Sequence, residues 1–140
     1  MSAISVKEKR YFQKVISSKF ASLLGVELMD VKPDSVTLKI SIDAEKHINA
    51  LNVVQGGVIM TIADIAMGCI CFNLEKEVST IDFNINFIKS AQPSGFIKAT
   101  GTVIHNGSKT MVTEAEVYDS EDKLIAKARG TFFVIGKFEQ

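Results

Sequence analysis

Apolar residues recur along this chain first with helical spacing and then with strand spacing. Over residues 6–24 they fall every three or four positions, which predicts a helix that stops at Gly25. The apolar positions of this helix are Phe12, Val15, Ile16, Phe20, Leu23 and Leu24. Residues 26–31 predict a short strand, followed by a turn at Pro33–Asp34. Residues 35–42 alternate strictly between polar and apolar, which predicts a half-buried strand.

A second helix is predicted from Gly56-Gly57 to about residue 75, after a polar loop over residues 43–52. Between Val58 and Leu74 its single charged residue is Asp64. A helix that is apolar on nearly every side belongs in the interior of a protein. We therefore expect this helix to form the centre of the fold.

Four strand patterns follow the second helix, over residues 78–88, 96–105, 109–118 and 124–135. Turn-forming residues separate them, so we expect four consecutive strands linked by hairpins. In the first of these strands Ile81, Phe83, Ile85 and Phe87 share one face, and the opposite face carries Thr80, Asp82, Asn84 and Asn86. That polar face fits a subunit boundary or a substrate tunnel, and it fits contact with water equally well.

The predicted order is α-β-β-α-β-β-β-β, without internal repeats or linkers. A run of hairpin-linked strands with one apolar helix predicts the α+β class, with an antiparallel sheet wrapped around that helix. The 140 residues suit one domain, 1–140, with an N-terminal helix over 1–24 and a central helix over 57–75.

Composition narrows the classes of partner and compartment. The 16 Lys and Arg residues equal the 16 Asp and Glu residues, so bulk charge does not favour nucleic acid or acidic membranes. No continuous apolar run reaches the roughly 20 residues of a membrane span, and charges occupy the place of a signal peptide's apolar segment. Cys69 and Cys71 point about 200° apart on their helix and cannot pair. With only two histidines a zinc site is not expected either, and the chain is expected to be cytoplasmic and free of metal.

Candidate chemistry is concentrated in residues 47–68. The N–H groups of Gly56 and Gly57 lie at the positive end of the helix dipole and could hold a carbonyl oxygen that becomes negative during attack. The glycines fit a tight join between loop and helix equally well. Asp64 lies between Ile and Ala residues, and a buried carboxylate needs a partner, a raised pKa or a chemical role.

These residues carry a resemblance to a known family. The pattern His47-x-Asn49, then Gly-Gly opening an apolar helix, then Ala-Asp-x-Ala-Met-Gly at 63–68, resembles hotdog-fold acyl-CoA thioesterases of the phenylacetyl-CoA thioesterase branch. Segments 80–87, 95–107 and 126–134 are similar to strands of that branch, so the resemblance covers about residues 26–135. It implies a hotdog fold with a sheet of five to six strands around a long central helix. The implied reaction is hydrolysis of a fatty or aromatic acyl-CoA to free acid and CoA, without a cofactor.

The resemblance assigns roles residue by residue. Asp64 matches the family's general base or nucleophile, and Asn49 matches a residue that orients water or substrate. Gly56 matches the amide that polarises the thioester carbonyl, and Thr80 the hydroxyl that helps to place the water. Gln55 departs from the family, which usually has His there; Gln forms hydrogen bonds but carries no proton near neutral pH.

A second set of positions matches segments that contact CoA in this family, although a solvated surface role fits each of them as well. They are Gly57, Lys89, Ser90, Ala91, His105, Asn106, Gly107, Ser108 and Lys109. His47 and His105 lie in a loop and beside a turn, and we expect surface or loop-packing roles for both rather than catalysis.

The spacing of Gly56 and Asp64 indicates self-association. Eight residues of helix separate them, about 12 Å at 1.5 Å per residue, which is too far for both to act on one thioester in one chain. Two copies with antiparallel central helices would solve this, and the family is known for sites shared within homodimers and homotetramers. Two other functions stay open: a binding module that holds acyl-CoA without hydrolysis, favoured by Gln55, and a hydratase or dehydratase, disfavoured because a His is missing there.

Overall fold

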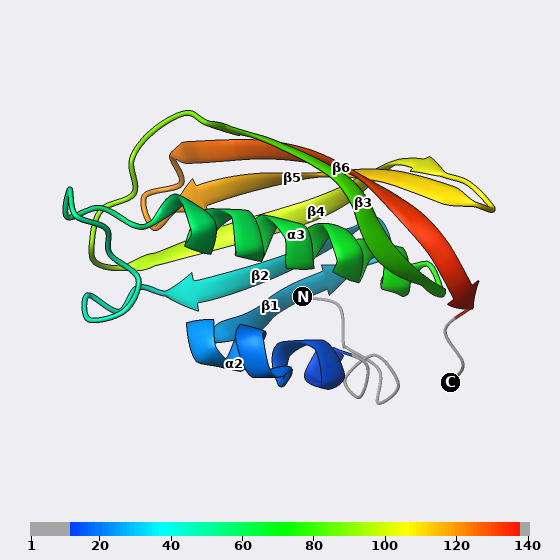
Figure 1. The fold of residues 1–140 in the computed structure, drawn as a ribbon, viewed down its shortest axis with the longest axis horizontal. Coiled ribbons are helices and arrows are strands. Elements are labelled where there is room, and N and C mark those ends of the chain that lie inside the picture. Colours follow the sequence, from blue (N-terminus) through cyan, green and yellow to red (C-terminus); the bar gives the residue numbers. More distant parts are fainter. Residues whose placement is uncertain (1–11, 138–140) are drawn as a thin grey trace.

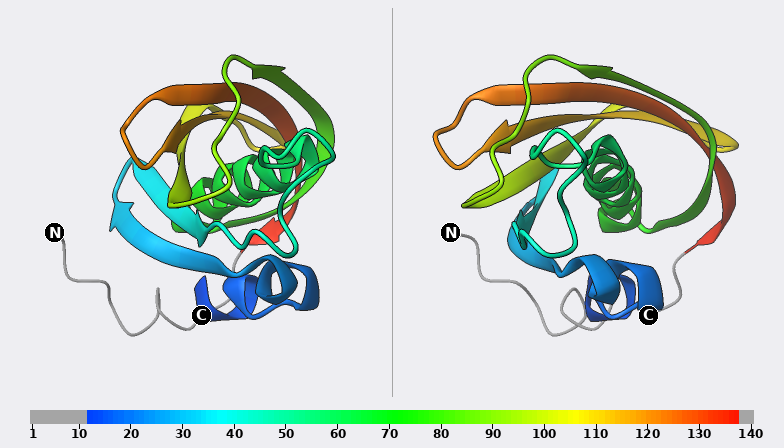
Figure 2. Two further views of the ribbon diagram at one scale, coloured as in Figure 1. Left: turned by 90° about the vertical axis from the view of Figure 1, so that its left-hand side faces the viewer. Right: turned by 60° about the vertical axis from the view of Figure 1, so that its left-hand side comes forward.

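The computed structural model describes residues 12–137, which form a six-stranded antiparallel sheet and helices on its concave side. The helices are α2 (Lys19–Leu24) and α3 (Gly56–Asn73), and the strands are β1 (Val26–Lys32), β2 (Ser35–Ser41), β3 (Lys76–Phe87), β4 (Phe96–Asn106), β5 (Thr110–Asp119) and β6 (Leu124–Lys137). The sheet arches around α3, and α2 lies across the open side of the arch (Figures 1 and 2). The α+β class and the sheet wrapped around a central helix are confirmed.

The predicted N-terminal helix is interrupted. Residues 12–16 are helical, and the helix is interrupted at Ser17 and Ser18. α2 follows and ends at its C-cap Gly25, as expected, where the backbone adopts a left-handed φ of 78°. Serine competes with the helical backbone for hydrogen bonds, and the Ser22 hydroxyl donates to the carbonyl of Ile16 across the break (3.3 Å). The residues before 12 lie outside the described part of the chain.

The break also changes which apolar residues of this segment are buried. Phe12, Ala21 and Leu24 pack into the core, whereas Phe20 and Leu23 are 58% and 61% exposed. The continuous buried stripe predicted for this helix is therefore wrong after the break, and two large apolar side chains of α2 remain exposed.

The sheet order is β1-β2-β4-β5-β6-β3, so of the predicted hairpin links between the last four strands, β4–β5 and β5–β6 are confirmed and β3–β4 is wrong. β3 pairs with β6 rather than β4, and residues 88–95 cross the end of the sheet. The amides of Ile88 and Lys89 donate to the carbonyl of Ile125 in this crossing (2.8 and 3.2 Å). The crossing places β3 and β4 on opposite sides of α3, which lets the sheet cover the apolar helix from both sides.

α3 is the core helix, and it approaches the sheet closely. A Cβ atom on Gly101 of β4 would lie 2.3 Å from the carbonyl oxygen of Ala66, so only glycine permits this contact. The hydroxyl of Thr113 on β5 donates to the carbonyl of Met67 (3.4 Å). By length and mean hydropathy (18 residues, 1.6) α3 could cross a membrane, a test that buried core helices also pass. Its contacts with β2 to β6 are those of a helix enclosed by its own sheet.

A β-bulge in β3 moves Thr80 and Ile81 out of the faces predicted for them, whereas the division from Asp82 to Phe87 is as predicted. Thr80 pairs with Phe132 and Asp82 with Thr131, so Ile81 has no partner on β6 and is 60% exposed. The extra residue reverses the alternation, and Thr80 therefore lies on the α3 side of the strand. Without the bulge Thr80 would face away from the helix.

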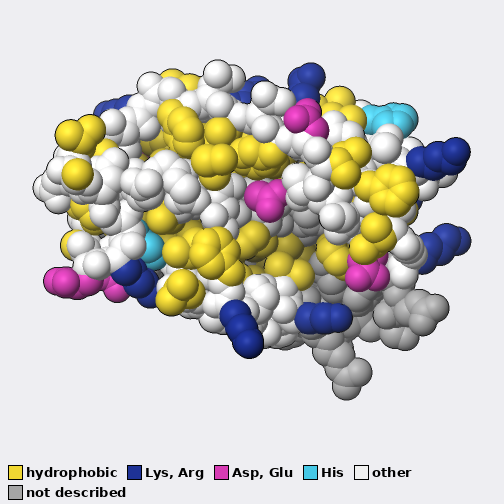
Figure 3. Space-filling model, in the orientation of Figure 1, with side chains coloured by type: hydrophobic (Ala, Val, Ile, Leu, Met, Phe, Trp, Pro, Cys, Tyr) yellow, Lys and Arg dark blue, Asp and Glu magenta, His cyan; other side chains and the backbone are white. Residues whose placement is uncertain are grey.

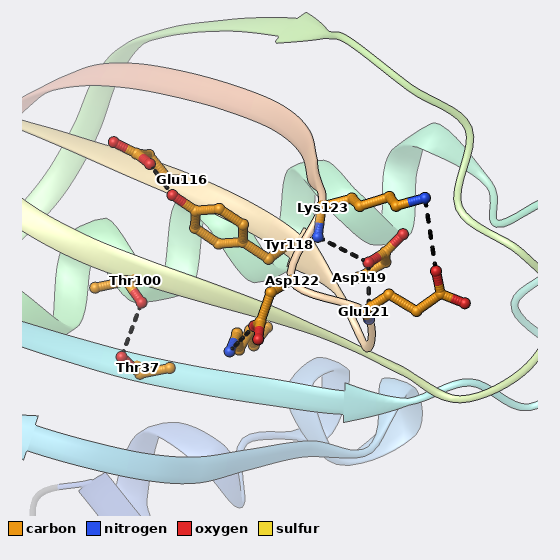
Figure 4. Close-up of polar contacts among 9 residues, drawn as sticks. Thr37, Thr100, Glu116, Tyr118, Asp119, Glu121, Asp122 and Lys123 are labelled. Carbon is orange, nitrogen blue, oxygen red and sulfur yellow. Dashed lines mark hydrogen bonds and ion pairs between the residues drawn. The ribbon is translucent and has the colours of Figure 1, made fainter.

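Short polar contacts hold the sheet and its turns together. The hydroxyls of Thr37 on β2 and Thr100 on β4 are 2.8 Å apart across the two strands. In the turn between β5 and β6, Asp119 Oδ1 accepts the amides of Glu121 and Lys123 (2.9 and 3.0 Å), as Figure 4 shows. Bonds from Asp to the backbone of the next residues are a common way to close such turns.

Gly101 gives the first prediction. Gly101→Ala should lower the free energy of unfolding by about 1–3 kcal/mol, because the new methyl group would push α3 away from β4. Urea denaturation at a fixed protein concentration measures this change. Gly136→Ala is the matched control, because a Cβ there meets no atom within 4 Å. Equal stability of the two variants would contradict the close packing of α3 on β4.

Candidate active site

Asp64 lies in the middle of α3 on the half-buried face of the helix that the sheet leaves open. Its Oδ1 accepts a hydrogen bond from the Thr80 hydroxyl on β3 (2.9 Å). Burial raises the pKa of the Asp64 carboxyl above its usual 3.8, and the Thr80 bond acts in the opposite direction by stabilising the charged form. The predicted pair Asp64 and Thr80 is thus brought together, and the β3 bulge makes this possible.

Two cavities meet at this pair. The larger, about 480 Å³, is lined by residues of α2, α3 and β3 and their flanks: Ser18, Phe20, Ala21, Met60, Thr61, Asp64, Ile65, Thr80 and Phe83. A smaller cavity of about 160 Å³ also has Asp64 and Thr80 in its wall. One acid and one neighbouring hydroxyl in a mainly apolar wall suit a ligand with an apolar body and one reactive polar group.

Only Asp64 and Thr80 of the nine residues that line the larger cavity were predicted as site residues, and the large apolar ones that were missed are Phe20, Met60, Ile65 and Phe83. Phe20 and Met60 are 58% and 40% exposed, on α2 and α3. Met60 and Ile65 are apolar neighbours of Asp64 on the same helix, but that pattern is also typical of an ordinary core, and no local signal links Phe20 of α2 or Phe83 of β3 to Asp64.

The first turn of α3 offers unpaired backbone donors. Neither Gly56 nor Gly57 donates its N–H to another described residue. The carbonyl of Gln55 accepts the amides of Val58 and Ile59 (3.0 and 3.4 Å), and the exposed Gln55 side chain forms no cap. A Cβ on Gly56 would lie 3.2 Å from Cζ of Phe87, so the helix start packs tightly against the end of β3. The expected donor site at Gly56 is therefore structurally available.

Asn49 shapes the loop before α3. Its Oδ1 accepts the amides of Leu51 and Val53 (2.9 and 3.2 Å). The side-chain oxygen is thus engaged by the loop itself, a role that the sequence did not predict. Only the amide nitrogen of the side chain remains for the predicted contact with water or substrate.

The two histidines differ in their surroundings. His47 is 1% exposed and packs within the loop, whereas His105 is exposed at the end of β4. The structure places neither among the residues lining the two cavities at Asp64.

The predicted CoA-contacting positions fall into two groups in one chain. Lys89 and Ser90 are exposed in the crossing after β3, and the buried Ala91 accepts the amide of Val54 on its carbonyl (3.0 Å). Residues 105–109 comprise the end of β4 and the turn to β5, at the opposite end of α3 from its first turn (Figure 1). There Lys76 donates to the side chain of Asn106 and to the carbonyl of Gly107 (2.6 Å for the latter).

Within one chain, the two cavities at Asp64 do not extend to Gly56. The residues lining the two cavities at Asp64 include neither Gly56 nor Gln55. The helix arithmetic of about 12 Å agrees with this separation. A single chain thus presents the acid and the backbone donor at two separate places.

Other reactive side chains near the centre are unsuited to nucleophilic attack. Cys69 and Cys71 are free and buried, and burial raises the pKa of each thiol to about 12, so neither forms a thiolate at neutral pH. Among residues 12–137 no group of three or more His, Cys, Asp or Glu side chains is placed to hold a metal ion.

Comparison with known proteins identifies relatives of this arrangement. A family model described as the thioesterase superfamily matches residues 51–126. A protein of Archaeoglobus fulgidus, whose name assigns it only provisionally to the esterases, is 30% identical over 92% of this chain and 82% of its own. The medium/long-chain acyl-CoA thioesterase YigI of Escherichia coli is 27% identical over 61% of this chain and 64% of its own.

The acyl-coenzyme A thioesterase PaaI of Escherichia coli is similar in both sequence and structure. The sequences are 23% identical over 83% of this chain and 82% of PaaI. A solved PaaI structure, from the phenylacetic acid degradation operon, superposes with a TM-score of 0.86 at 21% identity over 97% of this chain and 99% of that one. The hotdog fold and the resemblance to the PaaI branch are confirmed.

The Thr80 bond gives a prediction that needs no substrate. Thr80→Val should raise the pKa of Asp64 further, because the carboxylate loses the donor that stabilises its charged form. Thr80→Ser, which keeps a hydroxyl, should leave this pKa near that of the wild type. An NMR titration of the Asp64 carboxyl carbon measures the three values, and a lower pKa in Thr80→Val would contradict the bond.

Proposed function

The chain belongs to the thioesterase superfamily, and we infer that it hydrolyses the thioester of an acyl-CoA to a free acid and CoA. The observation that carries this inference is the Asp64 carboxylate, bonded to Thr80 and set in the wall of an apolar cavity. Relatives whose names specify acyl-CoA thioesterases support the substrate class. The acyl group, fatty or aromatic, would occupy the cavity beside Asp64.

The proposed reaction divides the work between two places. The N–H of Gly56, at the positive end of the α3 dipole, binds the thioester carbonyl oxygen and stabilises the negative charge that develops on it. Asp64 accepts a proton from water as the water oxygen bonds to the carbonyl carbon; the C–S bond then breaks and the proton passes to the CoA sulfur. In the alternative course Asp64 attacks directly, and water hydrolyses the resulting anhydride. Thr80 keeps the carboxylate oriented, and no metal or cofactor is required.

We propose that each site is shared by two chains. Gly56 and Asp64 are about 12 Å apart along one helix, and neither cavity at Asp64 reaches Gly56. Antiparallel packing of two α3 helices would bring Gly56 of one chain to Asp64 of the other. The open face of α3 favours such packing, since hydrophobic side chains gather on both sides of it (Figure 3).

The two groups of CoA-contacting positions fit the same assembly. Residues 89–91 lie near the start of α3, and residues 105–109 near its end. Antiparallel helices would bring the turn 105–109 of one chain towards residues 89–91 of the other. Lys89, Lys109 and His105 could then contact the phosphates of CoA, with Gly57 and the Ser and Asn side chains supplying hydrogen bonds. A homotetramer built from two such dimers is proposed on the family resemblance.

Gln55 is the residue on which the choice between hydrolysis of acyl-CoA and binding without hydrolysis depends. Its side chain is exposed beside the proposed carbonyl site, where it could bond to the substrate without transferring a proton. Acyl-CoA binding without turnover in a purified preparation would favour the binding-module alternative. For Asn49 we retain the proposal that its free amide nitrogen orients water or substrate. We place the protein in the cytoplasm, where its two free cysteines would stay reduced.

Asp64→Asn tests the proposed base. We expect kcat for acyl-CoA hydrolysis to fall by at least about a hundredfold, the usual loss for a general base. Since burial raises the pKa of Asp64, its charge costs stability at neutral pH, and the cost disappears as pH falls through that pKa. Asp64→Asn should therefore be at least as thermally stable as the wild type at pH 7. Near-wild-type kcat in this folded variant would exclude Asp64 as the base.

A complementation experiment tests the shared site. Asp64→Ala removes the base, and Gly56→Val displaces the Phe87 ring, tilting the Gly56 amide. Each homodimer should be nearly inactive. A hybrid dimer, co-expressed with two different tags and purified, has one site with both lesions and one intact site. It should recover about half of the wild-type kcat per dimer if each dimer has two equivalent sites.

The control is the same pair of lesions placed in one chain and paired with a wild-type chain. If sites are shared, each site of that hybrid carries one lesion and the dimer is inactive; if each chain has its own site, half of the activity remains. A verified hybrid of the two single variants that stays as inactive as its parents would rule out the shared site.

A further inference from the structure

His47 is a buried titratable residue that the proposed reaction does not use. It lies in the loop between β2 and α3, the segment that delivers Gly56 to the start of the helix, and only 1% of it is exposed. Three hydrogen bonds meet at this residue. Its amide donates to the carbonyl of Asp43 (2.9 Å), its carbonyl accepts the amide of Gln55 (2.8 Å), and its ring Nδ1 accepts the amide of Asp43 (2.9 Å).

The last of these bonds determines the protonation state of the ring. An N–H donor at 2.9 Å requires a lone pair on Nδ1, so the single ring proton is on Nε2 and the imidazole is neutral. Nε2 is buried, and the carbonyl of Leu24 faces the ring without reaching normal hydrogen-bond geometry to Nε2. A second proton would place two N–H groups against each other at Nδ1 and would put a charge in a buried position.

The bonds of His47 connect directly to the proposed carbonyl site. The Gln55 amide that His47 holds belongs to the residue immediately before Gly56. A bridge between Ile48 and Val54 and the bond from the Val54 amide to Ala91 continue the same connection. Displacement of His47 would therefore shift the backbone that orients the Gly56 N–H.

We propose that His47 is a positioning residue whose neutral imidazole holds the β2–α3 loop, and that its protonation releases the loop and disables the carbonyl site. This proposal rests on the proposed thioesterase function, because it concerns the orientation of Gly56 for the thioester. His47 itself does not touch the substrate.

The surroundings of the ring set the direction of its pH dependence. Burial lowers the pKa of His47 below 6.5, and the positive charge of Lys46 lowers it further. The carbonyl of Leu24 at the end of α2 and the negative charge of Asp43 raise this pKa and offset part of the lowering. Because the pKa of His47 is lower in the folded protein than in the unfolded chain, the neutral imidazole makes its full contribution to the stability of the fold above about pH 6.5. This contribution is lost as pH falls through the lower, folded value.

Two substitutions of His47 separate the acceptor, the charge and the shape of the ring, and a third at another histidine is the control. His47→Asn places an amide oxygen near the position of Nδ1 and does not titrate. His47→Phe keeps an aromatic ring without an acceptor. His105→Asn, at the exposed histidine of β4, is the control for removal of a histidine and is used only for amide exchange.

The first measurement is independent of enzymatic activity. In the wild type, ¹⁵N NMR should show the proton on Nε2, and amide exchange protection of Asp43 and Gln55 should fall by about tenfold or more between pH 7.5 and 5. His47→Asn should keep this protection over the whole range, and His105→Asn should behave as the wild type. His47→Phe should have low protection at every pH. A proton on Nδ1, or unchanged protection of both amides in His47→Phe, would overturn the proposal.

The second measurement follows kcat/KM for an acyl-CoA from pH 5 to 8. His47→Phe should lose about tenfold or more, chiefly in kcat, because a misplaced Gly56 fails to stabilise the transition state. His47→Asn should be more active than His47→Phe. Its kcat/KM should still decline at acid pH because Asp64 titrates, but without the part of the decline that belongs to His47. An acid decline identical to that of the wild type would overturn the proposal. If no acyl-CoA is hydrolysed by the wild type, the proposed function fails, while the tautomer and exchange data still decide the role of His47. If His47→Phe does not fold, the wild-type tautomer and the His47→Asn data decide it.

Discussion

The enclosure of α3 is the constraint on which the rest of the structure depends. An 18-residue helix with Asp64 as its single charge must be removed from water nearly all the way round. The sheet achieves this by crossing from β3 to β4 over the end of the helix, so that β3 joins the far edge beside β6. Gly101 allows the backbones to approach closely. One face of α3 remains open, and this is the face that carries Asp64, with α2 beside it.

Much of the fold could be predicted because periodicity reports which face of an element is buried. The helix start at Gly56, the turn after β1 and the strand positions near Val36, Leu38 and Ile40 all follow from local pattern. The pairing of β3 with β6 could not be predicted, because alternation identifies a strand but not its neighbour. The break at Ser17–Ser18 was also missed, because apolar residues keep their helical spacing across it.

The site shows the same division between local signal and tertiary placement. Asp64 was recognisable as one charge on an apolar helix. Its partner Thr80 was assigned through the family resemblance, although strict alternation placed it on the opposite face. A single unpaired residue, Ile81, reverses that face and creates the Asp64–Thr80 bond. The loop contacts of Asn49 and His47 depend on the folded path of residues 43–55, which composition alone does not reveal.

The open face of α3 reconciles two opposed requirements of the carboxylate. Asp64 must reach a substrate, yet it gains strength as a base when water is excluded and its pKa rises. In one chain these demands are balanced by partial burial and by the bond from Thr80. Any surface that covers this face, whether an acyl group or a second α3, withdraws the carboxylate further from water and raises its pKa again. Occupation of the face by an acyl group would thus strengthen the base when a thioester is present, and the helix that organises the core also sets the chemistry of its one charged residue.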